Sequence, residues 1–338
     1  MSFPSTSRQV GQRIDNREWL GLQCVALLGD RVVLDLAAGA SSPGVPMTSD
    51  TPLRWTCSSK IVTAILFAVL EDSGLLDVEA PVHHYLPDFA DRRITCAHLL
   101  NHSAGLAEEA EQPFLPRDVA VDLASTKPGQ PDFVVGEDRM YSSFASFSVL
   151  AAVAEAATGS SFPDLADQHV FRRAGVRPSF VDTTAVTWIG DSGTFASAVG
   201  PLIPAASLGS VFPGTGCVGT ALDLARLLRL MSVHSPLRPR SAAHYITRRA
   251  PFVPCRRSGD TAEWGLGFVV GPARFGRCAS AATFGHAGCR SSVVLHDPAH
   301  DLTIAIVGNT ISKSLLRSER VKPFIPALYA DLGLAAPR

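Results

Sequence analysis

The sequence has no long apolar run and no concentration of charge of one sign. No stretch approaches the roughly 18 apolar residues of a membrane span, and residues 1–8 lack the apolar segment of about 7–15 residues that a secretory signal needs. The formal net charge is -1, so no overall field attracts nucleic acid or an anionic membrane. We therefore expect a cytoplasmic protein whose partners are small molecules, with no nucleic acid and no membrane among them.

Paired cysteine motifs are also absent. The seven cysteines are widely scattered and odd in number, and none belongs to a C-x-x-C pair. This pattern argues against a disulfide framework and against a zinc cluster. We expect reduced and mostly buried thiols, no metal and no cofactor. Cys57 is an exception to this expectation, because it stands three residues before Lys60 at the start of a helix. Cys289 is a second thiol of interest.

Several catalytic motifs are missing as well. The chain contains no G-x-S-x-G, which excludes the nucleophile elbow of an α/β-hydrolase. It contains no H-E-x-x-H, no P-loop and no dinucleotide-binding fingerprint. Zinc proteases, P-loop enzymes and nucleotide-dependent oxidoreductases are therefore not favoured.

What is present predicts a folded chain with strands near both ends. Hydrophobic residues make up 46% of the 338 positions, enough for a sizeable core. A hairpin is expected at 22–39, around Gly29-Asp30, because short glycine-containing links favour hairpins. After about residue 260, β-branched and aromatic runs predict strands at 264–270, 282–284, 291–295 and 302–307.

The middle of the chain reads as helical. Apolar residues at 61, 64, 65, 68 and 69 have the spacing of a core-facing helix that ends at Gly74. Capping residues and helix-ending glycines predict further helices at 97–100, 144–158, 162–173 and 221–233, and a last amphipathic helix covers 323–334. This order predicts one sheet built from both termini, with a helical insertion between them.

Cys57 and Lys60 begin the first long helix. Positions three apart share one helix face, so the thiol and the ammonium point into the same space. The N-terminal end of a helix also favours a negative charge, by roughly 0.3–1 kcal/mol. Both effects stabilise a thiolate, the nucleophilic form of cysteine.

Five stretches resemble the serine β-lactamase-like and penicillin-binding superfamily, especially its class C and esterase branch. They match, in family order, the motifs S-x-x-K, L-L-x-H-[TS]-[SA]-G-L, Y-x-N, S-T-A-x-D-L-A and H-x-G. Here they read Cys57-Ser58-Ser59-Lys60, residues 99–106 (LLNHSAGL), Tyr141-Ser142-Ser143, residues 219–225 (GTALDLA) and Gly285-His286-Ala287-Gly288. Cysteine stands where these relatives carry the nucleophilic serine.

The resemblance implies an α/β (α+β) β-lactamase-like fold in which helices flank an antiparallel sheet. Residues 1–75 and 255–338 would form the sheet domain and 76–254 a mostly helical insertion, with the active site in the cleft between them. It implies Cys57 as nucleophile and Lys60 as the group that polarises or deprotonates it. Tyr141 would shuttle the proton, and His286 would line the site and bond the substrate or Tyr141.

The resemblance also implies the substrate-binding groups. The backbone N–H groups of Cys57 and Cys289 would form the oxyanion hole, beside Gly288. Ser143 replaces the family's Asn, which keeps a hydroxyl, removes an amide donor and counts against efficient β-lactam turnover.

The cysteine leaves several interpretations open. Cys57 is a working nucleophile, an engineered replacement of serine, or a remnant in an inactive protein; a shifted role for Ser58 or Ser59 is the fourth. We favour a working thiol, because Cys57 lies at the end of a helix and near Lys60. The acyl-enzyme is then a thioester, which reacts with amines far more readily, relative to water, than an oxygen ester does, and this favours transfer over hydrolysis. The expected function is an acyltransferase, a transacylase that forms amides or esters in antibiotic or other secondary-metabolite biosynthesis. The alternatives are a carboxylesterase or β-lactamase-like hydrolase, and an inactive binding protein.

Overall fold

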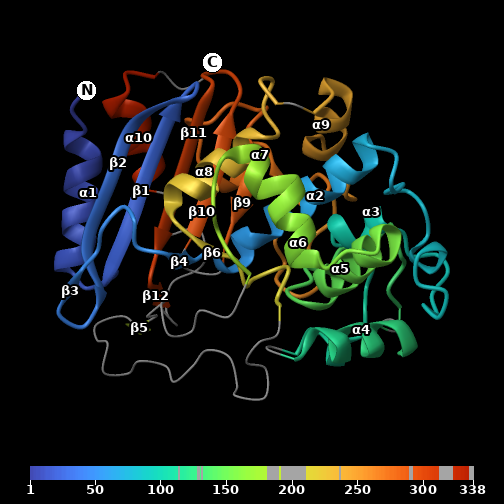
Figure 1. The fold of residues 1–338 in the computed structure, drawn as a ribbon. Coiled ribbons are helices and arrows are strands. Elements are labelled where there is room, and N and C mark those ends of the chain that lie inside the picture. Colours follow the sequence, from blue (N-terminus) through green and yellow to red (C-terminus); the bar gives the residue numbers. More distant parts are fainter. Residues whose placement is uncertain are drawn as a thin grey trace.

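The fold combines helices with one large antiparallel sheet (Figure 1). The computed structural model describes residues 1–112, 115–127, 130, 132–180, 190–191, 211–235, 237–288, 292–311 and 323–334. Within these residues the sheet has eight strands in the order β3-β2-β1-β11-β10-β9-β8-β7. The strands are β1 (Gly21–Leu28), β2 (Arg31–Ser42), β3 (Val45–Pro46), β7 (Glu263–Trp264), β8 (Val269–Val270), β9 (Phe284–Ala287), β10 (Ser292–Asp297) and β11 (Leu302–Gly308).

The two ends of the chain meet in the middle of this sheet. Strand β1 pairs with β11 from Leu22 opposite Gly308 to Leu28 opposite Leu302. The hairpin β1–β2 supplies one side of the sheet and the strands after residue 260 supply the other. The predicted fold, an antiparallel sheet built from both termini, is therefore confirmed.

Both faces of the sheet are covered. Along β1, Cys24 and Ala26 pack in the same core cluster as residues of α1 (Pro4–Asp15) and α10 (Phe324–Asp331). Val25 and Leu27 belong to the other cluster, with residues of α2 (Lys60–Asp72) and α8 (Ala221–Arg229). Successive side chains of a strand point to opposite faces, and burial of both faces explains the nearly unbroken apolar sequence of β1.

The remaining elements lie mostly between the two groups of strands in the sequence. The helices are α2 (Lys60–Asp72), α3 (Cys96–Leu100), α4 (Arg117–Thr126), α5 (Ala145–Thr158), α6 (Phe162–Ala166), α7 (Arg172–Ala174), α8 (Ala221–Arg229) and α9 (Pro239–Ile246). The 3-10 turns are η1 (Thr56–Ser59), η2 (Val82–His84), η3 (Glu108–Glu111) and η7 (Pro272–Arg274), and a π turn, η4 (Asp167–Phe171), joins α6 to α7. Short strand pairs form between β4 (Leu53–Arg54) and β6 (Val218–Gly219), and between β5 (Gly190–Asp191) and β12 (Thr310–Ile311).

The structure corrects the predicted secondary structure at a few elements. The strand expected at 264–270 is two short strands, β7 and β8, paired with each other. Gly267 lies at their turn with φ of +83°, a conformation that glycine adopts without strain. Helix α8 ends at Arg229 rather than Val233. The sequence did not predict α1 or α9. The division into a sheet domain and a helical insertion at residues 75/76 and 254/255 stays a prediction.

In the described ranges, every helix is too short or too polar to cross a lipid bilayer.

Candidate active site

Cys57 lies in the 3-10 turn η1, which leads directly into α2. Strand β4 delivers the chain to this turn, and the Trp55 N–H donates to the Cys217 carbonyl at 3.0 Å. Thr56 has φ of +49°, in the left-handed region that β-branched residues rarely occupy. The backbone therefore turns sharply immediately before Cys57, whose side chain is buried.

The two serines after Cys57 are engaged in the packing of this turn. Ser58 Oγ lies 2.8 Å from Ser292 Oγ on β10, and Ser292 Oγ donates to the Trp55 carbonyl at 2.6 Å. Ser59 Oγ accepts the Cys217 N–H at 3.0 Å. Both serines are fully buried. Their hydroxyl groups hold η1 against β10 and against the segment before β6.

Lys60 is completely buried, with 0% of its surface exposed. Its Nζ donates to the carbonyl oxygens of Ser143 at 2.9 Å and Gly214 at 3.1 Å. Nζ also lies 5.2 Å from the centre of the Tyr141 ring and 4.7 Å from that of Phe147. Carbonyl dipoles and ring faces compensate an ammonium for its lost water. A Cβ on Gly214 would lie 3.1 Å from Nζ, so glycine leaves the space that Lys60 occupies.

Tyr141 belongs to a cluster of rings next to Lys60. Its ring centre lies 4.4 Å from that of His102 and 5.7 Å from that of Trp264. Trp264 in turn contacts the His286 ring at 5.4 Å. Tyr141, Trp264 and Ala287 also line one cavity of about 20 Å³, room for roughly one water molecule. The loop of Tyr141 and strand β9 thus face a common space.

His102 is a buried titratable group of this cluster with a strongly shifted pKa. Its Nδ1 accepts the Ser142 N–H at 3.2 Å. Burial, and then the Lys60 charge, hold the pKa of His102 well below its ordinary value. The imidazole is therefore neutral near pH 7 and adds no positive charge beside Lys60.

The end of β9 packs against the turn that carries Cys57. Strand β9 contacts both η1 and α2. A Cβ on Gly288 would lie 2.5 Å from Thr56 Oγ1 and 2.9 Å from the Trp55 carbonyl, so only glycine fits here. His286 is buried on β9, opposite Val294 of β10. Cys289 lies outside the described residues.

The structure thus brings together most of the residues that the sequence singled out. Lys60 lies near the Tyr141 ring and donates to the main-chain carbonyl of Ser143. His286 reaches this group through Trp264. The catalytic roles given to these side chains stay predictions.

Sequence reasoning gave no role to four residues that shape the site. His102 lies in the quoted L-L-N-H segment, and its buried contacts explain that motif. Trp264 and Gly214 carry no motif. Glu111 holds the turn after Tyr141 through hydrogen bonds to Ser142, Ser143, Phe144 and Ala145. No local pattern distinguishes it from its acidic neighbours.

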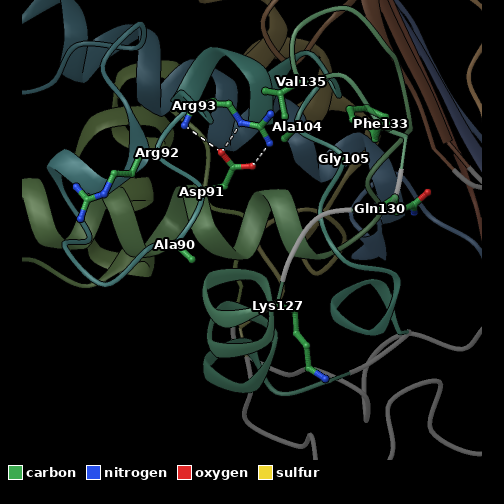
Figure 2. A pocket seen from close by; sticks show the side chains of 10 residues that line it. All are labelled: Ala90, Asp91, Arg92, Arg93, Ala104, Gly105, Lys127, Gln130, Phe133 and Val135. Atoms are coloured by element: carbon green, nitrogen blue, oxygen red, sulfur yellow. Dashed lines mark hydrogen bonds and ion pairs between the residues drawn. The ribbon is translucent and has the colours of Figure 1, made fainter.

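A larger cavity, of about 510 Å³, is lined by none of the predicted site residues (Figure 2). Arg93 and Asp91 form a bidentate ion pair on its wall, with Nε and Nη2 at 2.9 and 2.7 Å from the carboxylate oxygens. The hydrogen bonds from Arg93 lower the pKa of Asp91. The described residues include no group of three or more His, Cys, Asp or Glu side chains placed to hold a metal ion.

The geometry agrees with a comparison against protein families. The model of the Beta-lactamase family matches residues 7–317. The chain belongs to the beta-lactamase family. This is the family whose motifs the sequence resembles.

Individual relatives are similar over shorter regions. The chain is 28% identical over 145 residues to penicillin-binding protein 4* of Bacillus subtilis, which covers 40% of this chain and 32% of that protein. It is 29% identical over 100 residues to the ML-236A carboxylate methylbutanoyltransferase of Penicillium citrinum, 24% of each chain. The matched regions span less than half the length of these two relatives.

A solved structure matches over nearly the whole chain. EstCE1, described as a hydrolase with promiscuous acyltransferase activity, superposes with a TM-score of 0.79 at 21% identity. The match covers 96% of this chain and 98% of that chain. At this identity the likeness shows the beta-lactamase-like fold.

Proposed function

We propose that the chain is an acyltransferase that forms a thioester on Cys57 and passes the acyl group to an amine or hydroxyl acceptor. The observation that carries the proposal is the buried Lys60 ammonium, one helical turn after Cys57 and 5.2 Å from the Tyr141 ring. A fixed cation near a thiol favours the thiolate, and so does the N-terminal end of α2.

In the proposed reaction, Cys57 Sγ attacks the carbonyl carbon of an ester or thioester donor. The bond from that carbon to the alcohol or thiol breaks, and the proton of Cys57 reaches the leaving group through Tyr141 or Lys60. The acceptor then attacks the thioester, the carbon–sulphur bond breaks, and the acceptor's proton returns to sulphur through the same groups. Tyr141 and Lys60 thus act first as base and then as acid.

The oxyanion would be held by the backbone N–H groups of Cys57 and Cys289, beside Gly288. Each such donor contributes about 2.7–4 kcal/mol in the transition state. His286 would bond the substrate or Tyr141, and Ser143 would line the same side of the site. The buried hydroxyls of Ser58 and Ser59, engaged with Ser292 and Cys217, disfavour either serine as the nucleophile.

Transfer rather than hydrolysis is supported by the chemistry of sulphur. A thioester discriminates in favour of amines over water, which an oxygen ester does less well. A relative named as a methylbutanoyltransferase and a structural neighbour with promiscuous acyltransferase activity support the same reaction class. We propose that the product is a secondary metabolite made in the cytoplasm. The second candidate is a carboxylesterase, because EstCE1 is described as a hydrolase.

The test first acylates the protein and then measures how the acyl-enzyme divides between transfer to an amine and hydrolysis by water. The protein is mixed with an activated ester, and intact and peptide masses locate the adduct, which we expect on Cys57. Amine acceptors should then release more amide than acid. In Cys57→Ser the acyl-enzyme is an oxygen ester, so the ratio of amide to acid should fall. Cys57→Ala should lose both products.

Cys278→Ser is the matched control, because Cys278 is more exposed than Cys57 and so reports non-specific labelling. Full activity in Cys57→Ala would exclude the thioester. Acid as the main product even with amine present would establish the esterase. A wild-type protein that takes no acyl group would be a binding protein.

A further inference from the structure

The turn that carries Tyr141 is held almost entirely by side chains. Six consecutive backbone N–H groups donate to side-chain atoms rather than to other backbone groups: Tyr141 to Cys255 Sγ (3.3 Å), Ser142 to His102 Nδ1 (3.2 Å), Ser143 and Phe144 to Glu111 Oε2 (2.7 and 3.2 Å), Ala145 to Glu111 Oε1 (3.2 Å) and Ser146 to Ser142 Oγ (2.9 Å). These acceptors come from three distant segments and from within the turn itself. The backbone geometry of this turn is therefore set by tertiary contacts.

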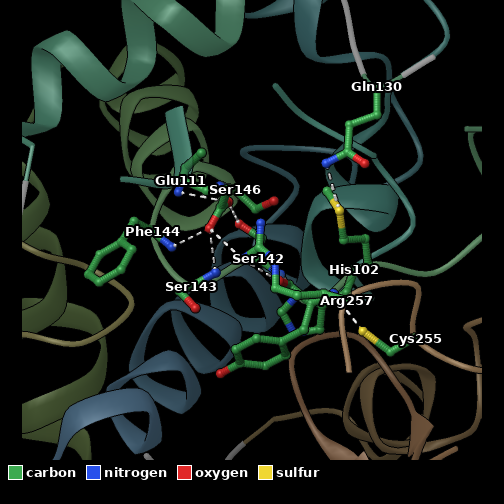
Figure 3. Close-up of polar contacts among 12 residues, drawn as sticks. His102, Glu111, Gln130, Ser142, Ser143, Phe144, Ser146, Cys255 and Arg257 are labelled. Atoms are coloured by element: carbon green, nitrogen blue, oxygen red, sulfur yellow. Dashed lines mark hydrogen bonds and ion pairs between the residues drawn. The ribbon is translucent and has the colours of Figure 1, made fainter. Parts of the chain in front are cut away.

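Glu111 is the centre of this arrangement. Figure 3 shows its carboxylate at the turn, surrounded by Ser142, Ser143 and Phe144. Only 2% of the Glu111 side chain is exposed, and besides three N–H groups it accepts the hydroxyl of Ser142. Arg257 Nη1 lies 3.8 Å from Glu111 Oε2. Both carboxylate oxygens are occupied by donors.

Capping of α5 alone does not account for this carboxylate. Burying a charge is costly, although a helix N-terminus returns about 0.3–1 kcal/mol to a nearby anion. A serine or aspartate at the N-cap position, just before the helix, satisfies one donor at lower cost, but Phe144 occupies that position and makes no such bond. Glu111 reaches further back, to Ser142 and Ser143, and so fixes the residues between Tyr141 and the helix.

Those residues are the ones that contact Lys60. The Tyr141 ring lies 5.2 Å from Nζ, and the Ser143 carbonyl accepts from Nζ at 2.9 Å. Arg257 also donates to the Tyr141 carbonyl at 3.4 Å. A shift of the turn would therefore move the phenol and one acceptor of the ammonium together.

We propose that Glu111 is a positioning residue, which holds the Tyr141–Ser143 turn so that the phenol and the Lys60 ammonium meet beside Cys57. The inference rests on the proposed function for its effect on rate. The contacts that carry it are independent of that function, and one of the two tests below needs no activity.

The first test is a double-mutant cycle on the rate of Cys57 acylation. Glu111→Gln keeps the size of the side chain but turns an NH₂ group toward N–H donors. It should lower the rate at least about 10-fold, because small misplacements of a reacting group have large effects. In the Tyr141→Phe background the same change should cost no more than about two-fold, since coupled residues are not additive. An equal loss in both backgrounds would overturn the inference.

Two further variants serve as controls for this double-mutant cycle. Glu109→Gln removes an exposed carboxylate from the same turn, η3, and should leave the rate unchanged. Ser142→Ala removes one of the donors to Glu111, keeps the carboxylate and serves if Glu111→Gln does not fold. It should lower the rate in the same direction, by less. An unchanged rate in both Glu111→Gln and Ser142→Ala contradicts the role.

The second test reports Tyr141 directly. The protein has four tyrosines, so fluorotyrosine labelling gives four ¹⁹F signals, and Tyr141→Phe assigns one of them. Glu111→Gln should move the Tyr141 signal and leave those of Tyr85, Tyr245 and Tyr329 in place, and Glu109→Gln should move none. An unmoved Tyr141 signal, or a shift of all four, overturns the inference. If the wild-type protein takes no acyl group, the proposed function fails and this signal decides the inference alone.

Discussion

The Lys60 ammonium is removed from solvent, and its partners come from separate segments of the chain. Its hydrogen bonds go to Ser143, just before α5, and to Gly214, shortly before β6. A buried ammonium costs several kcal/mol unless it is compensated, so a helix that needed only stability would carry an apolar side chain here. The proposed reaction gives the charge a use.

Replacing Lys60 with methionine tests that use. Methionine fills much of the same space without charge, so the folded state should be as stable or more stable, while Cys57 loses the group that favours its thiolate. We expect the acylation rate of Cys57 to fall by about 100-fold or more. The rate and the free energy of unfolding are measured side by side. Lys127→Met, at an exposed lysine, is the control. An undiminished rate would assign Lys60 a structural role.

Residues of the site differ in how visible they are in the sequence. Cys57 and Lys60 stand three apart at the start of an apolar helix, a local pattern that can be recognised from the sequence alone. Glu111 stands close to Glu108 and Glu109, three like carboxylates within four residues. The sequence alone does not show that Glu111 is the buried one of Glu109 and Glu111, because the groups that Glu111 accepts from lie 31–34 residues further along the chain.

At the scale of elements, the pairing of β10 with β11 buries a histidine. His296 lies opposite Thr303, and its Nδ1 is 2.9 Å from Thr303 Oγ1. Burial, and then the charge of Arg229, lower the pKa of His296 from 6.5 to about 4. Between these two values the unfolded chain binds a proton that the folded chain does not bind. Acidification through this range therefore favours unfolding.

We expect the free energy of unfolding to fall between pH 6.5 and pH 4, with His296 contributing on the order of 3 kcal/mol. His296→Gln should flatten that part of the profile, whatever its effect at pH 7. Urea unfolding at several pH values measures this. His84→Gln, at an exposed histidine, should leave the slope as in the wild type. Parallel profiles for wild type and His296→Gln would show that another group sets the acid limb.

The elements that the sequence predicted well have strong local signals. Gly159, which has φ of +73°, caps the C-terminal end of α5. The capping box of Thr220 and Asp223 begins α8. Helix α1 was missed because its sequence is polar and includes Gly11; its contacts with α10 come from the far end of the chain. The run 264–270 looks like one strand until Gly267 turns it.

At the scale of the molecule, the two terminal helices are joined by one carboxylate. Asp331 of α10 accepts the N–H groups of Ser5 and Thr6 at 3.1 and 2.7 Å, and the hydroxyl of Thr6 at 2.8 Å. Figure 1 shows α1 and α10 side by side at the edge of the fold. Asp331 thus supplies the cap that the first turn of α1 lacks in its own sequence.

Asp331→Asn should lower the free energy of unfolding by about 1 kcal/mol, because it removes the charge and one acceptor at a helix N-terminus. Urea unfolding measures the change. Asp15→Asn removes an exposed acid from the opposite end of α1, where a negative charge is unfavourable, and should be neutral or slightly stabilising. Equal effects of the two substitutions would argue against the cap.

The pairing of β1 with β11 also has a consequence during synthesis on the ribosome. Strand β1 is complete at residue 28, but its partner begins only at residue 302. At about 5–20 residues per second the hairpin β1–β2 waits on the order of tens of seconds, with one edge open. During that time Cys57 has neither β9 nor β10 beside it. A chain released before its last strands are made would therefore expose an unpaired strand edge that is prone to aggregation. Its Cys57 thiol would also lack a complete site.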